Sequence, residues 1–135
     1  MVLFVCVRNS GKSQMAAGLM RQASAGEVVA LSAGTVPGEK LNALSLAALA
    51  EVGVDISGGV PKPVDAGLLA RADLVVLLGH EAQLDVPVGV RVRRWETDEP
   101  SLRGIEGIQR MRLVRDDIAA RVHDLATELS SPVQS

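Results

Sequence analysis

The feature that most constrains the fold lies at the start of the chain, where a short apolar run changes into a helical pattern across one loop. Residues 2–6 (VLFVC) are continuously apolar and include β-branched residues, which is typical of a buried parallel strand. The loop 7–12 (VRNSGK) follows, and Ser13 is the expected N-cap of a helix. Apolar residues then recur at helical spacing, at Met15, Ala16, Leu19, Met20 and Ala23. The chain therefore begins as strand, loop and helix, an arrangement that brings loop N–H groups to the positive end of a helix dipole.

Apolar strands and helical segments alternate along the rest of the chain. Further strands are expected at 28–34, 74–79 and 90–95, and further helices at 41–53, 65–73 and 105–129. This alternation predicts one α/β domain over residues 1–130, with a doubly wound four-stranded parallel sheet and helices on both faces. Residues 131–135 are expected to form a flexible tail. Ligands bind beyond the carboxyl ends of the strands in such sheets, so the loop 7–12 is the expected site.

Composition argues against several classes of function. A net charge of −2, with one Phe, one Trp and no Tyr, offers neither a basic patch nor stacking surfaces for nucleic acid. No apolar run approaches the length of about 18 residues that a membrane span requires. Cys6 is the sole cysteine, so no intramolecular disulfide can form, and the cytoplasm is the expected location. No cluster has metal-ligand spacing, so neither a metal nor a bound cofactor is expected, and a homodimer is compatible with the sequence.

The loop differs by one residue from each of two phosphate-binding signatures. Gly in place of Cys6 would complete a Walker A motif, and Arg in place of Lys12 would complete the Cys-x5-Arg-Ser loop of a cysteine phosphatase. The first is disfavoured because the third strand ends in Gly79 rather than in an acidic residue for magnesium. A turn that binds nothing is a further alternative, but it does not explain a cysteine that faces converging N–H donors.

The second signature makes Cys6 a candidate nucleophile that attacks the central phosphorus or arsenic atom of a bound oxyanion. The helix N-terminus and Lys12 favour a thiolate, and the Ser13 hydroxyl is expected to donate to it. Arg8 points either at the substrate or at solvent. The expected oxyanion-binding residues are Val7, Arg8, Asn9, Ser10, Gly11, Lys12 and Ser13.

Motifs along residues 2–129 resemble the low-molecular-weight tyrosine phosphatase fold, and most closely the arsenate reductases that share it. They are VLFVC, KSQMAAGL, LSAGT (31–35), LNALSLAALAEVGVDIS (41–57), PK (61–62), ADLVVLLG (72–79), RRWETDEP (93–100) and RMRLVRDDIAARV (110–122). Two departures set the subtype. Phosphatases and thioredoxin-coupled arsenate reductases of this fold carry Arg at the position of Lys12, and the thioredoxin-coupled enzymes also carry two further cysteines after the third strand.

A loop with one cysteine and Gly-Lys-Ser is similar to that of the actinobacterial arsenate–mycothiol transferases. The resemblance implies that Cys6 attacks arsenate, that mycothiol then attacks the arsenic of the enzyme-bound adduct, and that mycoredoxin releases arsenite. A lone cysteine cannot supply both electrons, so an external thiol is required for reduction. Two alternatives stay open: a low-molecular-weight tyrosine phosphatase that hydrolyses phosphomonoesters through a phosphocysteine, and a non-catalytic oxyanion-binding regulatory module.

In the family pattern an Asp directly before a Pro, after the fourth strand, protonates the leaving oxygen. Glu99 occupies that position and is the expected acid, with Asp98 in reserve and a solvated acidic loop as the alternative. His80 is expected to be a loop residue and His123 a surface residue. On the last helix, the arginines at 110, 112, 115 and 121 are expected to form a polar face that pairs with Asp116, Asp117 and Asp124.

Overall fold

Strands and helices alternate along the chain as expected. The computed structural model describes residues 1–130, so the tail expected at 131–135 lies outside the described residues. The elements are β1 (Val2–Cys6), α1 (Lys12–Ala23), β2 (Ala30–Gly34), α2 (Ala43–Ala50), α3 (Ala66–Arg71), β3 (Leu74–Leu78), β4 (Arg91–Trp95), the 3-10 helix η1 (Pro100–Arg103) and α4 (Gly107–Ser130). The expected segments are all present among these residues, and their ends differ by a few residues from those expected.

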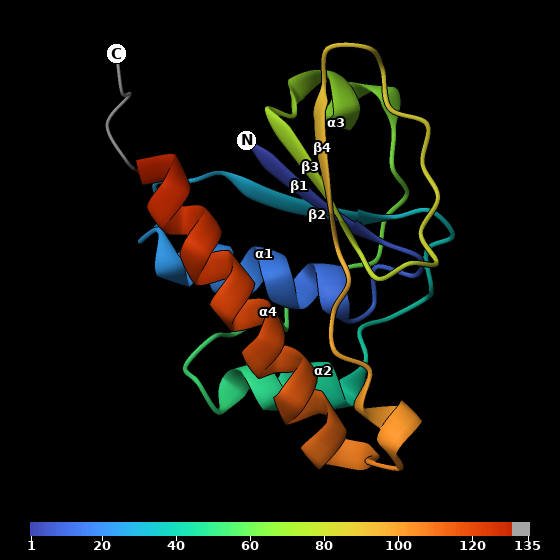
Figure 1. Cartoon of the computed structure of the whole chain (residues 1–135), viewed down its shortest axis with the longest axis vertical. Helices are drawn as coiled ribbons and strands as arrows, with labels where there is room; N and C mark the ends of the chain where they lie inside the picture. The colour runs from blue at the N-terminus through green and yellow to red at the C-terminus, as the bar shows by residue number, and fades with distance from the viewer. Residues whose placement is uncertain (131–135) are drawn as a thin grey trace.

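The four strands form one parallel sheet in the order β2-β1-β3-β4, which confirms the predicted fold class. Every residue of β1 is buried, and its last residue, Cys6, lies opposite Gly34 at the end of β2. Because the strands are parallel, β1, β2 and β3 present their carboxyl ends at one edge, where the loop 7–12 leaves the sheet (Figure 1). β4 is the edge strand next to β3, and its arginines are exposed or half-buried.

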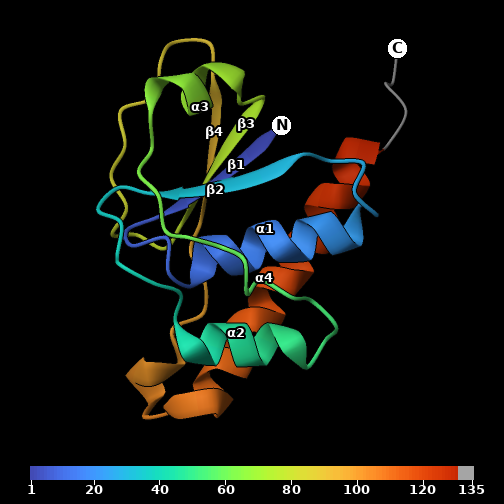
Figure 2. The ribbon, with the colours of Figure 1, turned by 180° about the vertical axis from the view of Figure 1, so that it is seen from behind.

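Helices cover both faces of the sheet, because successive side chains of a strand point to opposite sides. Phe4 and Cys6 face the larger cluster, which α1, α2 and α4 complete. Leu3 and Val5 face the smaller cluster, which α3 covers. Two views from opposite sides show α1 between β2 and α2, with α4 crossing α1 (Figures 1 and 2). Within residues 1–130 no helix combines the length and the apolar character that a membrane crossing requires.

Candidate active site

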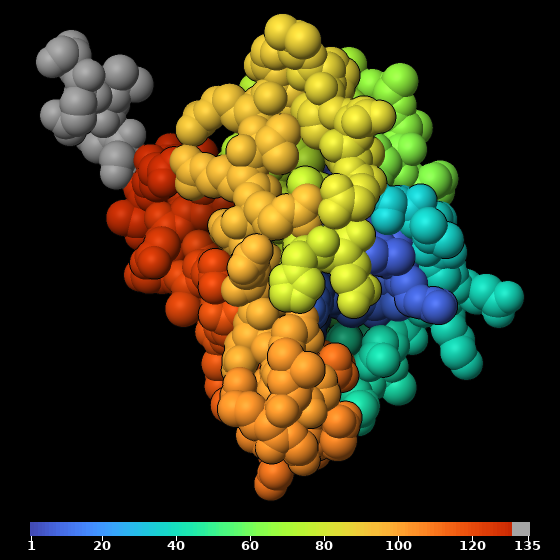
Figure 3. All heavy atoms as spheres, turned by 45° about the vertical axis from the view of Figure 1, so that its right-hand side comes forward, coloured from blue at the N-terminus to red at the C-terminus, as the bar shows by residue number. Residues whose placement is uncertain are grey.

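A pocket of about 490 Å³ opens where β1 and β3 end, and Cys6 lies in its wall. The other walls come from the loop 7–12, the start of α2, the residues after β3, the segment around η1 and the first turns of α4. The surface is recessed at this place, with the blue loop visible between the yellow segment after β3, the orange segment of η1 and the segment leading into α2 (Figure 3). Segments far apart in the sequence therefore share one cavity next to the thiol of Cys6.

Two donors converge on the sulfur of Cys6, which is the last residue of β1. The backbone N–H of Asn9 donates to Sγ at 3.2 Å, and the Ser13 Oγ lies 2.9 Å from it. The side chain of Cys6 is buried but still reaches the pocket, since the residue is 8% exposed. A sulfur held in this way is positioned to react with a group that enters the pocket.

The hydrogen bonds around Asn9 determine which atom carries the proton between Ser13 and Cys6. The backbone N–H of Lys62 donates to Asn9 Oδ1 at 3.0 Å, so the amide nitrogen of Asn9 faces Ser13 Oγ, to which it donates at 2.7 Å. The serine oxygen already accepts one hydrogen bond, so its own hydroxyl proton is free to point at the sulfur. This chain of donors stabilises a negative charge on Cys6. Asn9 is fully buried and holds a left-handed φ of 56°, a conformation that asparagine tolerates better than most residues.

The role expected of Ser13 as an N-cap is wrong. Helix α1 begins at Lys12, its N-cap is Gly11, and no side chain caps it. Ser13 lies inside the first turn and is fully buried, and its hydroxyl contacts the sulfur instead of a backbone N–H. The preference of serine for helix starts therefore predicts that Ser13 lies at the beginning of α1, but it does not predict the contact of the hydroxyl with Cys6.

The backbone of the loop turns its carbonyl groups away from the pocket. The carbonyl oxygens of Cys6, Val7 and Arg8 accept from the N–H groups of residues 35, 36 and 38, which continue from β2. Gly34 allows this approach, because a Cβ there would lie 2.7 Å from the Val7 carbonyl oxygen.

On the pocket side, the loop N–H groups are available to a ligand. Among residues 1–130, the N–H groups of Arg8, Ser10 and Gly11 have no hydrogen-bond partner, and these residues line the pocket. Val7 and Lys12 line it as well, whereas Asn9 and Ser13 lie beneath it against the sulfur. Free N–H groups next to a helix N-terminus form a site for a tetrahedral anion.

The acidic residues expected near the site are placed differently from one another. Glu99 lines the pocket and forms an ion pair with Lys12, in which both side chains are about three-quarters buried. Asp98 does not line the pocket, and its carboxylate is paired with Arg103. That guanidinium holds the pKa of Asp98 below its usual value, so Asp98 is a poor proton donor. In the described part of the chain, no group of His, Cys, Asp and Glu residues could hold a metal ion.

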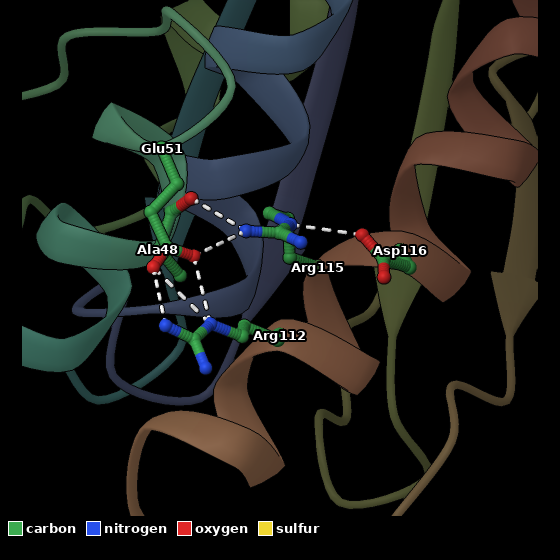
Figure 4. Close-up of polar contacts among 5 residues, drawn as sticks. All are labelled: Ala48, Glu51, Arg112, Arg115 and Asp116. Atoms are coloured by element: carbon green, nitrogen blue, oxygen red, sulfur yellow. Dashed lines mark hydrogen bonds and ion pairs between the residues drawn. The ribbon is translucent and has the colours of Figure 1, made fainter.

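The expected polar face of α4 is only partly present. Arg121 pairs with Asp117 as expected, but Arg112 pairs with Glu51 of the segment after α2, and no ion pair with Asp124 exists among residues 1–130. Arg115 is 9% exposed, and it reaches Glu51, the Ala48 carbonyl oxygen and Asp116 (Figure 4). Arg115 is buried because it lies four residues after the buried Met111, on the side of α4 that packs against α2.

Arg110 is one of the pocket residues that reasoning from the sequence missed. It was assigned to the polar face, but its side chain lines the pocket, and its Nε is inaccessible to solvent and has no hydrogen-bond partner. The available signal was its spacing, since Arg110 lies four residues before the buried Val114. His80 and Arg8 are exposed at the rim of the pocket, and His123 is exposed on α4 as expected.

The comparison with known families agrees with this geometry. The family model described as low molecular weight phosphotyrosine protein phosphatase matches residues 1–135. The chain belongs to this family. A putative arsenate reductase of Halobacterium salinarum is 33% identical over 133 residues, which covers 94% of this chain and 91% of that protein.

Solved structures of proteins that are named as arsenate reductases have the same fold as this chain. A structure described as an arsenate reductase in the phosphate binding state has a TM-score of 0.83 and 30% identity, with 96% of this chain and 98% of that chain covered. A thioredoxin-dependent arsenate reductase of Corynebacterium glutamicum has a TM-score of 0.78 and 32% identity, with 96% of this chain and 62% of that chain covered. Relatives named for arsenate reduction therefore share the fold, at 30–33% identity.

Proposed function

We propose that this chain is an arsenate reductase in which Cys6 attacks arsenate bound by the loop 7–12 and an external low-molecular-weight thiol completes the reduction. The observation that carries the proposal is the placement of the sole sulfur nucleophile, beneath unpartnered loop N–H groups and in contact with Ser13 and the Asn9 N–H. The names of the relatives support arsenate as the substrate.

The first step is substitution at arsenic. Arsenate accepts hydrogen bonds from the N–H groups of Arg8, Ser10 and Gly11, and the Cys6 thiolate displaces one hydroxyl of arsenate to form a sulfur–arsenic bond. Ser13 and the Asn9 N–H hold the thiolate until that bond forms. The bound anion competes with Glu99 for Lys12, which releases the Glu99 carboxyl to take up a proton and pass it to the leaving oxygen as water forms.

The second step needs electrons that the chain does not hold. Reduction of arsenate to arsenite takes two electrons, and two thiols supply them by forming one disulfide. Cys6 is the only cysteine of the chain, so one thiol must come from outside. The external thiol attacks the arsenic and displaces the Cys6 thiolate. A second external thiol then attacks the sulfur of the new thiol–arsenic adduct, so that a disulfide forms between the two external thiols and arsenite leaves with the electron pair of the sulfur–arsenic bond.

The lone cysteine also bears on the identity of the reductant. The similar protein from Corynebacterium glutamicum is named as thioredoxin-dependent, whereas this chain lacks the two further cysteines that thioredoxin-coupled enzymes of the fold carry after β3. We therefore propose mycothiol as the co-substrate and mycoredoxin as the protein that releases arsenite, in the cytoplasm. No bound cofactor is part of this scheme.

A phosphatase is the second candidate, because hydrolysis of a phosphocysteine needs no second thiol. Lys12 argues against it, since a lysine offers a point charge where the phosphatase loop has a planar guanidinium that grips two oxygens. A non-catalytic oxyanion-binding module is the third reading, and it predicts binding without turnover.

The three readings are separated by one assay panel. Arsenite formation is measured with mycothiol plus mycoredoxin, with glutathione plus glutaredoxin and with thioredoxin alone, and hydrolysis of an aryl phosphate is measured alongside. The proposal predicts arsenite with mycothiol plus mycoredoxin and little aryl-phosphate turnover. Aryl-phosphate turnover with no arsenite under any thiol would support the phosphatase, and binding of phosphate without either activity would support the regulatory module.

A further inference from the structure

The lysine of the loop is already paired within the protein. Lys12 and Glu99 form an ion pair inside the pocket, and each side chain is less than a quarter exposed. An arriving oxyanion therefore has to share the Lys12 charge with this carboxylate or displace it. Even then an ammonium group is a point charge, so it cannot bind two oxygens of one anion in a fixed geometry.

A second cation of the pocket has no partner. Four arginines among residues 1–130 are not exposed: Arg93, Arg110, Arg115 and Arg121. Three of them are paired with carboxylates. Arg93 pairs with Glu128, Arg115 pairs with Glu51 and Asp116, and Arg121 pairs with Asp117. Arg110 has neither an ion pair nor a side-chain hydrogen bond in the described part of the chain, and its Nε is shielded from water. A shielded guanidinium edge without an acceptor is costly, because the lost hydration is not replaced.

The position of Arg110 places this unpaired charge at the pocket. Arg110 lines the same pocket as Cys6. The neighbouring residue Met111 contacts Ser45 of α2, which in turn lies against Gly11 of the loop, so a single side chain separates the start of α4 from the loop. Arg110 also lies in the first turn of α4, where the helix dipole disfavours a cation and favours an anion.

We propose that Arg110 binds the oxyanion in the pocket and supplies from α4 the guanidinium fork that Lys12 cannot provide. Its two terminal nitrogens donate to two oxygens of the anion, which neutralises a guanidinium that has no carboxylate partner among residues 1–130. The inference rests on the proposed function in taking arsenate as the natural anion, but the binding itself needs only a tetrahedral oxyanion. Arg110 is then a substrate-binding residue that no motif of the loop contains.

The test measures oxyanion binding without turnover. Inorganic phosphate and inorganic arsenate are titrated by calorimetry into the Cys6→Ser chain, and into the same chain carrying Arg110→Gln, Arg110→Lys or Arg112→Gln. Arg112→Gln is the matched control, because it removes the same charge two residues away on the exposed side of α4. Thermal unfolding of each variant shows that it is folded, and Arg110→Lys carries the test if Arg110→Gln does not fold.

The expected result is a loss of affinity specific to Arg110. Arg110→Gln should weaken the binding of both anions by about tenfold or more, which is the effect of losing a charged hydrogen-bonding partner. Arg110→Lys should retain part of the affinity, and Arg112→Gln should change it by less than about twofold. Unchanged binding in Arg110→Gln, or an equal loss in Arg112→Gln, would overturn the proposal.

Steady-state kinetics of the chain with Cys6 intact separate this inference from the proposed function. Arg110→Gln should raise KM for arsenate and leave KM for the thiol unchanged. The opposite pattern would place Arg110 on the co-substrate and overturn the inference. If the parent chain forms no arsenite with any thiol while Arg110→Gln still loses phosphate affinity, the proposed function fails and the inference stands. If the parent forms arsenite and Arg110→Gln binds phosphate normally, the inference fails and the function stands.

Discussion

Replacing Ser13 by alanine removes the hydroxyl that contacts the nucleophile. Ser13 Oγ lies 2.9 Å from Cys6 Sγ, and the only other donor to that sulfur among residues 1–130 is the Asn9 N–H at 3.2 Å. A hydrogen bond to a charged group contributes about 1.5–3 kcal/mol, which corresponds to roughly a tenfold to hundredfold change in a rate that depends on it. Ser13→Ala should therefore slow alkylation of Cys6 by iodoacetamide by about tenfold or more at pH 6.

The assay follows alkylation by mass spectrometry. Because Cys6 is the sole cysteine, the added mass reports on this residue alone. Ser13→Thr keeps a hydroxyl and should restore most of the rate. Ser10→Ala, in the same loop but without contact to the sulfur, should leave the rate unchanged. Because Ser13→Ala also leaves the Asn9 amide without its acceptor, unfolding by urea checks that the fold is intact. An alkylation rate equal to that of the parent in a folded Ser13→Ala would refute the assigned direction of the hydrogen bond.

Three further predictions concern the loop cation, the backbone contact and the pairing of α2 with α4. Lys12→Arg should raise aryl-phosphate turnover, because a guanidinium can grip two oxygens; no gain would count against the argument that Lys12 disfavours phosphoryl transfer. Gly34→Ala should destabilise the fold by about 1–3 kcal/mol in urea unfolding, because its Cβ would lie 2.7 Å from the Val7 carbonyl oxygen, whereas Gly58→Ala, with open space around it, should not. The contact with Arg112, followed by that with Arg115, lowers the pKa of Glu51 to about 2. The ionised Glu51 therefore stabilises the folded state at pH values above the pKa that Glu51 has in the unfolded chain, and this stabilisation is lost as the pH falls toward 2. Glu51→Gln should accordingly be less stable than the parent at pH 7, with a gap that closes toward pH 2, and a gap independent of pH would contradict the assignment.

The fold and the position of the site follow from patterns that are local in the sequence. The change from a continuous apolar run to helical spacing occurs within residues 2–23, so the strand, the loop and α1 are determined by neighbouring residues. The same holds for the alternation of strands and helices, which predicts a parallel sheet and therefore the edge at which ligands bind. The loop was identified as the site for the same reason.

The contacts within the site depend on residues far apart in the chain, which no local pattern reveals. The orientation of the Asn9 amide is set by the N–H of Lys62, and the partner of Lys12 is Glu99, 87 residues away. Arg110 illustrates the limit most clearly. A charged residue on an amphipathic helix is normally expected on the exposed face, but the buried side of α4 continues from the core into the wall of the pocket, where Arg110 is one of the lining residues.

Arsenite release under single-turnover and multiple-turnover conditions tests the central claim most directly. The parent chain and Cys6→Ser are each given arsenate with and without mycothiol plus mycoredoxin, and arsenite and oxidised thiol are both quantified. The proposed function predicts that the parent releases arsenite only when the external thiol is present, with two thiols oxidised for each arsenite, and that Cys6→Ser releases none. Arsenite formed by the parent without any external thiol, or formed equally by Cys6→Ser, would contradict it.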